Sequence, residues 1–289
     1  MQDLISKRLS TLAPPYQALV DLSGVHDLRA DSGLEGHVLL WRMEQGFPAD
    51  SRQVRSRPYG VPLVVILPSS VGSPGKQDLL KIIRDCRPSV ALPPGSFPTA
   101  EDIRLLLSEA PVDLPGDVVD YLRWRGVALE ADIRHTIRRT LELSQELRSV
   151  NALSRSLYLS RRALGRRFLS RGLPVPSHWL QIGRLLRACL SIQSPGVNLA
   201  EVAFGLGYPD AFALSNQMMR LAGVRPALVR KRAGWEWLLE SWLCKEEALG
   251  CLPCLAAPTR VPPFSQQKPK PDSPSARLNR ARPTGRRDA

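Results

Sequence analysis

Arginine guanidinium groups are concentrated in one part of the chain, and they are well suited to bind phosphates and the edges of guanine bases. Residues 150–233 hold thirteen Arg and Lys residues against two Asp and Glu, a net charge of +11. Residues 1–149 hold eighteen basic residues against nineteen acidic ones, and residues 234–289 hold nine basic residues against six acidic ones. Together with the central segment they give the total net charge of +13. A partner with dense negative charge is the simplest explanation, because each neutralised phosphate releases a counterion. The competing interpretation is a solvated, arginine-rich surface.

The elements that must position these side chains follow from a pattern near the carboxyl end of this segment. Asn198 is placed to cap a short helix, and Asp210 to cap a second one. Gly207 lies between them, where a tight turn requires positive φ. Gly223 ends the second helix and Pro226 starts the next element. The expected inward positions are Leu199, Val202, Ala203, Leu206, Leu214, Met218 and Leu221.

A second copy of this pattern lies upstream. One helix is expected over about 150–157, Ser160 is placed to cap another, and Pro174 and Pro176 close the copy. Its expected inward positions are Leu153, Leu157, Leu164 and Phe168. A linking helix over about 177–192 is roughly 24 Å long at ~1.5 Å per residue. With the turns at its ends, it sets the two outer helices about 34 Å apart, which is one turn of DNA.

These residues resemble the AraC/XylS family of bacterial transcription regulators, and the resemblance covers roughly residues 130–232. The family's DNA-binding domain is two helix-turn-helix units joined by one helix. The matching residues are Ser160, Leu164, Arg166, Phe168, Pro176, Arg184, Leu185, Ala188, Val202, Ala203, Gly207, Tyr208, Asp210, Gly223, Pro226 and Arg230. The departures are Leu173, Phe212, Leu214, Asn216 and Met218. The resemblance implies a regulator that binds double-stranded DNA sequence-specifically, with recognition helices in successive major grooves, but the departures leave its target sequence open.

Candidate contact residues follow from the resemblance and from side-chain chemistry. An arginine grips guanine O6 and N7, an asparagine pairs with adenine, and an alanine touches a thymine methyl group. The base-contact candidates are Arg161, Arg162, Arg166, Ala211, Phe212, Ser215 and Asn216. The phosphate-contact candidates are Arg155, Arg167, Arg171, Arg184, Arg187, Arg220, Arg225, Arg230, Lys231 and Arg232. In the alternative hypothesis, the helical segment docks on an acidic protein partner.

The sequence shows no Ser-His-Asp set, carboxylate pair or metal-binding cluster, so no enzyme, cofactor or metal is expected. Five cysteines, an odd number, favour a reducing compartment over a disulfide framework. Cys244, Cys251 and Cys254 include a Cys-x-x-Cys pair, but no nearby histidine supplies a fourth metal ligand. Incidental thiols are the simpler interpretation.

The amino-terminal half has a different pattern. A β-branched apolar run over 61–68 predicts a buried strand, and residues 76–86 predict a helix with Leu79, Leu80, Ile83 and Cys86 inward. A strand at about 89–94, further helices and an earlier strand at 36–43 complete a small parallel α/β domain. No nucleotide-binding glycine motif is present, and no carboxylate follows the strands as a phosphate acceptor requires. A degenerate receiver-like sensor of an unknown effector stays open.

The expected organisation is an α/β domain over 1–129, a double helix-turn-helix domain over 130–249, and a basic Pro/Arg-rich tail over 250–289. The tail is expected to be disordered, either adding weak DNA attraction or remaining solvated. The stripe Trp235, Leu238, Leu239 and Trp242 is expected to pack in the core or in an oligomer contact. With no apolar run of membrane-spanning length and no signal-peptide pattern, a cytoplasmic protein is expected. RNA polymerase and a second copy of the chain are further possible partners.

Overall fold

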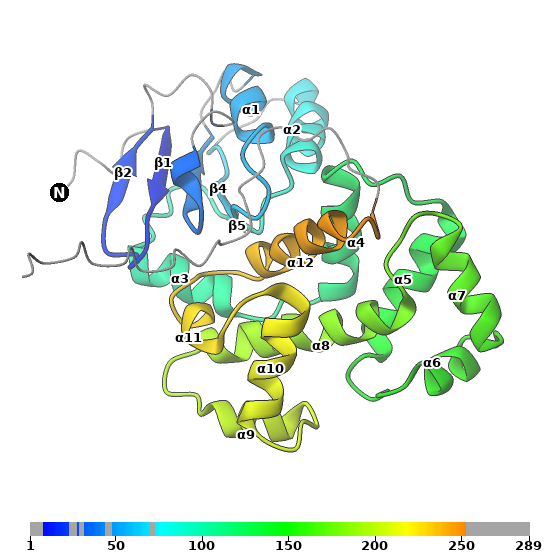
Figure 1. Cartoon of the computed structure of the whole chain (residues 1–289). Coiled ribbons are helices and arrows are strands. Elements are labelled where there is room, and N and C mark those ends of the chain that lie inside the picture. Colours follow the sequence, from blue (N-terminus) through cyan, green and yellow to red (C-terminus); the bar gives the residue numbers. More distant parts are fainter. Residues whose placement is uncertain (1–7, 23–27, 29–31, 44–47, 70–72, 253–289) are drawn as a thin grey trace, which may run out of the picture.

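The computed structural model describes residues 8–22, 28, 32–43, 48–69 and 73–252, in an amino-terminal half built on a sheet and a helical half (Figure 1). The strands are β1 (Leu9–Leu12), β2 (Leu19–Asp21), β3 (Val38–Arg42), β4 (Leu63–Ile66) and β5 (Val90–Leu92). The helices of this half are the 3-10 turn η1 (Ser32–Leu34), α1 (Pro48–Arg55), α2 (Ser73–Cys86) and α3 (Ala100–Ser108). The predicted α/β class of this half is therefore confirmed.

The sheet is mixed and not wholly parallel, which corrects one part of the prediction. Its strand order is β2-β1-β3-β4-β5. The expected strands β3, β4 and β5 are parallel, with Leu39 opposite Leu63 and Val64 opposite Val90. Strands β1 and β2 were not predicted, and β1 is antiparallel to both of its neighbours. At four and three residues they are too short to show a period.

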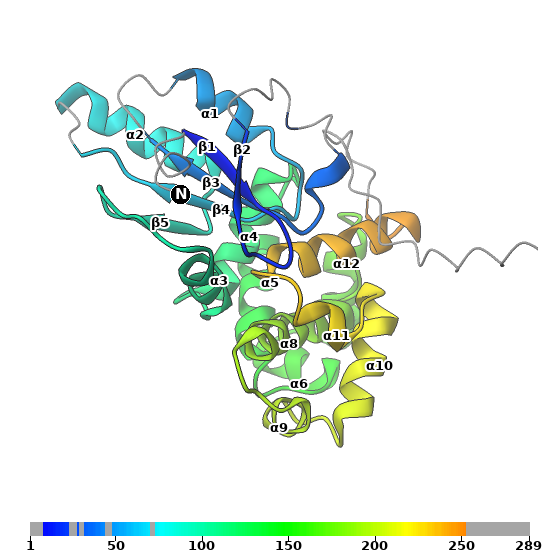
Figure 2. The same cartoon turned by 90° about the vertical axis from the view of Figure 1, so that its left-hand side faces the viewer.

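Helices cover both faces of the sheet (Figure 2). On one face, Trp41 and Val65 pack with Val54 of α1 and Cys86 of α2. On the other face, the alternate strand residues pack against α3 and against Ala233, which the chain brings back from its helical half. The period-two alternation therefore gives the inner strands β1, β3 and β4 two buried faces, while the edge strands β2 and β5 are partly exposed.

Helix α2 is rotated relative to the prediction. Leu80, expected to face inward, is 65% exposed. Leu79, Ile82 and Cys86 pack against the sheet in its place, and Ile83 is half-buried. These three lie three and four residues apart, so they share one side of the helix.

The helical half surrounds α8 (Figure 1). Its helices are α4 (Leu114–Trp124), α5 (Ala131–Leu143), α6 (Val150–Ser156), α7 (Arg161–Leu169), α8 (Pro176–Gln193), α9 (Leu199–Gly205), α10 (Ala211–Ala222), α11 (Pro226–Val229) and α12 (Glu236–Ala248). Helix α4, expected in the amino-terminal domain, packs in this core, since Val118 and Leu122 join Ile137 and Leu185. The two cores therefore divide between α3 and α4, ahead of the expected boundary at residue 129.

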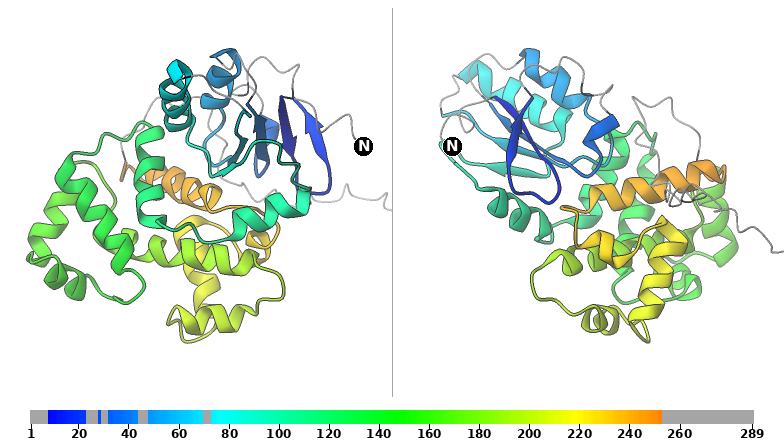
Figure 3. Two further views of the ribbon diagram at one scale, coloured as in Figure 1. Left: turned by 180° about the vertical axis from the view of Figure 1, so that it is seen from behind. Right: turned by 60° about the vertical axis from the view of Figure 1, so that its left-hand side comes forward.

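Helix α12 crosses between the two halves (Figure 3). Its expected apolar stripe is buried, and Trp242 meets Trp179 of α8 edge-on with ring centres 4.8 Å apart. The stripe is therefore part of the chain's own core and is not free for an oligomer contact. On its polar side, the buried Glu240 accepts a hydrogen bond from Arg125 Nε at 2.9 Å. Residues 253–289, with most of the predicted tail and Cys254, lie outside the described residues.

Candidate nucleic-acid interface

The first helix-turn-helix unit is α6 and α7, and its caps are those expected from the sequence. Ser160 Oγ accepts a hydrogen bond from the Ala163 amide at 3.1 Å at the start of α7. Leu164 and Phe168 on one side of α7 are fully buried. The opposite side of α7 therefore faces solvent. Beyond α7, Gly172 takes a φ of 62°, so it serves in the turn where Leu173 replaces the family's glycine.

The second unit is α9 and α10, and it repeats this construction. Asp210 Oδ1 accepts a hydrogen bond from the Ala213 amide at 2.6 Å. Leu214 and Met218 are fully buried, as predicted. Gly223 ends the helix with a left-handed φ of 74°. Figure 1 places the two units at different ends of α8.

The base-contact candidates lie on the outer sides of the two second helices. Arg161, Arg162 and Arg166 are exposed, and within the described chain none of them pairs with an acid. On α10, Asn216 is exposed and Phe212 is 72% exposed. Ala211 and Ser215 are half-buried beside them. The α7 candidates are thus cationic, while the α10 candidates are neutral and include one large aromatic ring.

The phosphate-contact candidates divide into free and partnered side chains. Arg155, Arg225 and Lys231 are exposed, and their side chains make no hydrogen bond or ion pair with the described residues. Arg220 donates to Gln217 Oε1 at 2.8 Å, and Arg230 donates to the Val197 carbonyl at 2.8 Å. Both of these remain exposed.

Two more candidates are half-buried and anchor α7 and the residues after it to the start of α5. Arg171 donates to Glu130 Oε2 at 2.7 Å and to Asp132 Oδ2 at 3.1 Å. Arg167 donates to Thr136 Oγ1 at 3.1 Å. These ion pairs hold the first unit against α5, so only part of their charge is left for an outside partner.

Three phosphate-contact candidates are corrected, because the fold engages them internally. Arg184 is only 9% exposed, its guanidinium carbon lies 5.5 Å from the Tyr208 ring centre, and burial lowers its pKa. Arg187 donates to Ser144 Oγ at 2.6 Å and to two carbonyls, and burial lowers its pKa as well. Arg232 donates to the Glu35 carbonyl at 2.8 Å, which ties α11 to the amino-terminal half.

One exposed side chain of the first unit is absent from the contact candidates predicted from the sequence. Tyr158 stands in the turn of the first unit with a left-handed φ of 53°, and its side chain is 96% exposed. The Tyr158 amide donates a hydrogen bond to the Arg155 carbonyl at 3.0 Å. Aligning the two helix-turn-helix copies in the sequence sets Tyr158 opposite Gly207, and this alignment could have identified the position.

Residues 153–232 match the family model described as a helix-turn-helix domain. This segment is an AraC-type helix-turn-helix domain. Comparison with curated proteins and comparison with solved structures each found no match. The AraC-type domain contains the second half of α6 and all of α7 to α11, and so it holds every base-contact candidate. A domain of this type supports a DNA-binding transcription regulator.

Other kinds of site find less support in the part of the chain that the structure describes. No three His, Cys, Asp or Glu side chains gather there as metal ligands. No described helix is long and apolar enough to cross a membrane. Cys251, one of the clustered cysteines, is exposed, while Cys244 is buried and its thiol lies 3.3 Å from Glu240 Oε1.

Proposed function

We propose that the AraC-type domain binds double-stranded DNA sequence-specifically, with α7 and α10 in successive major grooves. The observation that carries this proposal is the repetition of one construction. Each unit caps its second helix with an acceptor side chain and buries one side of it. Each leaves the other side exposed, which is the geometry that entry into a major groove requires.

The two units read different bases in this proposal. Arg162 and Arg166 of α7 each donate to guanine O6 and N7, a contact worth about 1–3 kcal/mol of discrimination. Asn216 of α10 pairs with adenine, while Ala211 and Phe212 contact thymine methyl groups. The first half-site is therefore guanine-containing and the second is A·T-rich. Arg161 and Ser215 flank these contacts and are the remaining base-contact candidates.

Phosphate contacts fix the position of the domain on the duplex. Arg155, Arg225 and Lys231 are free to make them, and the exposed Arg220 and Arg230 need only exchange an internal acceptor for a phosphate oxygen. Tyr158 joins this set, because its side chain is 96% exposed in the turn of the first unit and carries a hydroxyl group that can donate to a phosphate. Arg167 and Arg171 contribute less, since acids of α5 already neutralise part of their charge.

The experiment is a selection of fragments that the full chain binds from a pool of random duplexes, followed by a salt titration of the affinity. We expect a site with two unlike half-elements about one DNA turn apart. We also expect log K to fall steeply with log salt, with a slope of about −5 to −9 for some 6–10 phosphates. No enrichment together with a flat salt dependence would favour the alternative, docking on an acidic protein surface.

The proposed regulator is not an enzyme, and its amino-terminal half serves as a sensor or contact domain. RNA polymerase and a second copy of the chain are its candidate protein partners. Their support is the regulatory type of the domain, and the selection experiment tests neither. Co-purification of the full chain with RNA polymerase, and its mass in solution, are the separate measurements for these partners.

A further inference from the structure

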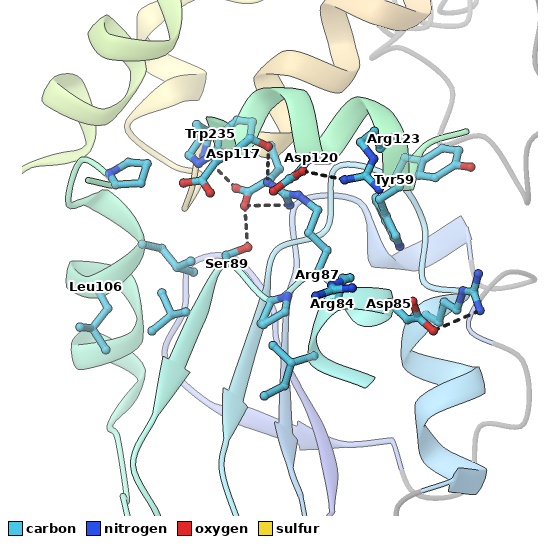
Figure 4. A pocket seen from close by; sticks show the side chains of 18 of the residues that line it. Tyr59, Arg84, Asp85, Arg87, Ser89, Leu106, Asp117, Asp120, Arg123 and Trp235 are labelled. Carbon is cyan, nitrogen blue, oxygen red and sulfur yellow. Dashed lines mark hydrogen bonds and ion pairs between the residues drawn. The ribbon is translucent and has the colours of Figure 1, made fainter. Parts of the chain in front are cut away.

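A cleft of about 1230 Å³ lies where the sheet half meets the helical half (Figure 4). Its walls come from the ends of α1, α2 and α3, the start of β5, one side of α4 and the start of α12. Small-molecule sites favour such boundaries between structural units. Apolar side chains of the wall, Leu106, Leu107, Val90 and Val112, offer a surface for the body of a ligand.

Arg87 is the unusual residue of this cleft. It takes a left-handed φ of 48°, which is rare for a long side chain. Its guanidinium carbon lies 4.9 Å from the Tyr121 ring centre and 5.1 Å from that of Trp235. Figure 4 shows Arg87 and Ser89 pointing across the cleft towards Asp117 and Trp235. Strained residues of this kind cluster at ligand sites.

The hydrogen bonding of Arg87 is incomplete. Its side chain is 10% exposed, and Nη2 donates to the Asp117 carbonyl at 3.2 Å. Nε and Nη1 have no hydrogen-bond partner among the described residues. The carboxylate of Glu236 lies 3.7 Å from Nη1, near enough for charge attraction but too far for a hydrogen bond. Buried donors without acceptors are costly, so an acceptor is expected to enter here.

The charges around the cleft balance in number, but two arginines at its exposed rim are unpaired among the described residues. Five arginines and five acids line it. Three of the acids are already paired with arginines, Asp85 with Arg55, Asp120 with Arg123 and Glu236 with Arg87. Asp117, whose pKa is raised by burial, and Glu109 are the other two acids of the lining. Arg52 and Arg84 are exposed and pair with no acid in the described chain.

We propose that this cleft binds a small ligand carrying a carboxylate or phosphate group on an apolar body. The oxyanion of the ligand supplies acceptors to Arg87 and takes the place of the Glu236 carboxylate, which lies too far from Nη1 for a hydrogen bond. Arg84 at the rim adds a second positive charge, and the apolar body lies against Leu106 and Val112. Arginine is suited to this role because its fixed donors match both oxyanions.

Helix α12 connects this site to DNA reading, a step that rests on the proposed function. Glu236 is the first residue of α12, and Ser89 and the Trp235 amide both donate to its carboxylate. Further along the same helix, Lys245 donates to the carbonyls of Met219 and Arg220 at the end of α10. A ligand that displaces Glu236 therefore moves a helix that holds the second recognition helix.

The test is calorimetric titration of the full chain with three probes of similar shape: phenylacetate, phenyl phosphate and the phenethylammonium cation. We expect at least one anion to bind with one-to-one stoichiometry and the cation not to bind. Comparing phenylacetate with phenyl phosphate decides between a carboxylate and a phosphate ligand.

Arg84→Gln, which alters an exposed side chain, should weaken binding about tenfold, a difference of about 1.4 kcal/mol. Arg87→Gln should do the same if its melting temperature is unchanged. Arg134→Gln, an exposed residue outside the cleft, should bind as the unaltered protein does.

Binding of neither anion, equal binding of the cation, or an Arg84→Gln protein that binds like Arg134→Gln overturns the site. The coupling is read from the DNA affinity with the anion present, where we expect a change of about fivefold or more. Lys245→Met should abolish that change and leave the calorimetric binding intact. A ligand that binds without altering DNA affinity overturns the coupling alone, and a chain that binds the ligand but no duplex overturns the proposed function alone.

Discussion

Tyr158 and Gly207 occupy the same place in the turns of the two helix-turn-helix units. Their φ values are 53° and 72°, both left-handed. The amide after Tyr158 donates to Ser154 at 2.9 Å, and the amide after Gly207 donates to Ala203 at 2.8 Å. The two turns therefore have one geometry, and only the second turn carries the residue that adopts it without strain.

Replacing Tyr158 by glycine should raise the free energy of unfolding by about 1 kcal/mol, because a left-handed side-chain residue costs roughly 1–2 kcal/mol and glycine gives back part of that in backbone entropy. The same change should weaken DNA binding if the hydroxyl group contacts a phosphate. Urea denaturation and duplex titration measure the two effects. As the matched change, Gly207→Ala should destabilise, since a side chain at its left-handed φ of 72° is strained. A Tyr158→Gly protein with lower stability contradicts the strain argument.

The ion pairs of Arg125 should be essential to the packing of α4 against α12. Its side chain is 2% exposed and bonds Glu240 at 2.9 Å and Glu247 at 2.8 Å. Arg125→Met strands two buried carboxylates and should lower the free energy of unfolding by about 3–5 kcal/mol. The neighbouring Arg123 is exposed, so Arg123→Met should stay within about 0.5 kcal/mol. Equal urea midpoints for the two variants would refute this role.

Tyr16 should make stability depend on alkaline pH. Burial raises its pKa from 10.0 to about 12, while its hydroxyl group donates to the Gly36 carbonyl and accepts from the Ala233 amide. The folded state thus holds the phenol proton more tightly than the unfolded state. This contribution is complete below pH 10 and declines as pH rises towards 12, by up to about 3 kcal/mol at ~1.4 kcal/mol per pKa unit. Tyr16→Phe should flatten that decline, and an unchanged slope would count against it.

Exposed and buried arginines should differ in their effect on the salt dependence of duplex binding. Arg155 is exposed and free, so Arg155→Gln should reduce the salt slope of duplex binding by about 1. Arg184 is buried over Tyr208, so Arg184→Gln should leave the slope unchanged and lower the melting temperature instead. The affinities are measured between low and moderate salt for both variants. The reverse pattern would mean that burial does not decide which arginines reach the DNA.

The helix-turn-helix half could be predicted well because local signals determine it. Caps such as Ser160 and Asp210, and inward residues such as Leu164 and Met218, depend only on neighbours within a few positions. Long-range contacts leave no comparable pattern in the sequence. The internal roles of Arg184 and Arg232 depend on Tyr208 and Glu35, and their surroundings in sequence look like those of any surface arginine.

The amino-terminal half was harder for the same reason. Strands β1 and β2 are defined by pairing and not by pattern, and the buried Ser10 and Thr11 of β1 read as a polar loop. The cleft around Arg87 depends on α12, a segment nearly 150 residues away, as the bond from Ser89 to Glu236 shows. Its chemistry becomes visible only after folding.

The central claim is that α7 and α10 read bases together on one duplex. It is tested most directly by the ratio of affinities for the selected site and for a scrambled duplex, measured at one salt concentration with the full chain. Arg162→Ala and Asn216→Ala should each lower that ratio by about tenfold or more, at about 1–3 kcal/mol per lost base contact. Inserting about five base pairs between the half-sites should lower it further, because the second helix then faces the wrong side of the DNA. An unchanged ratio in both variants and with the insertion would contradict the account.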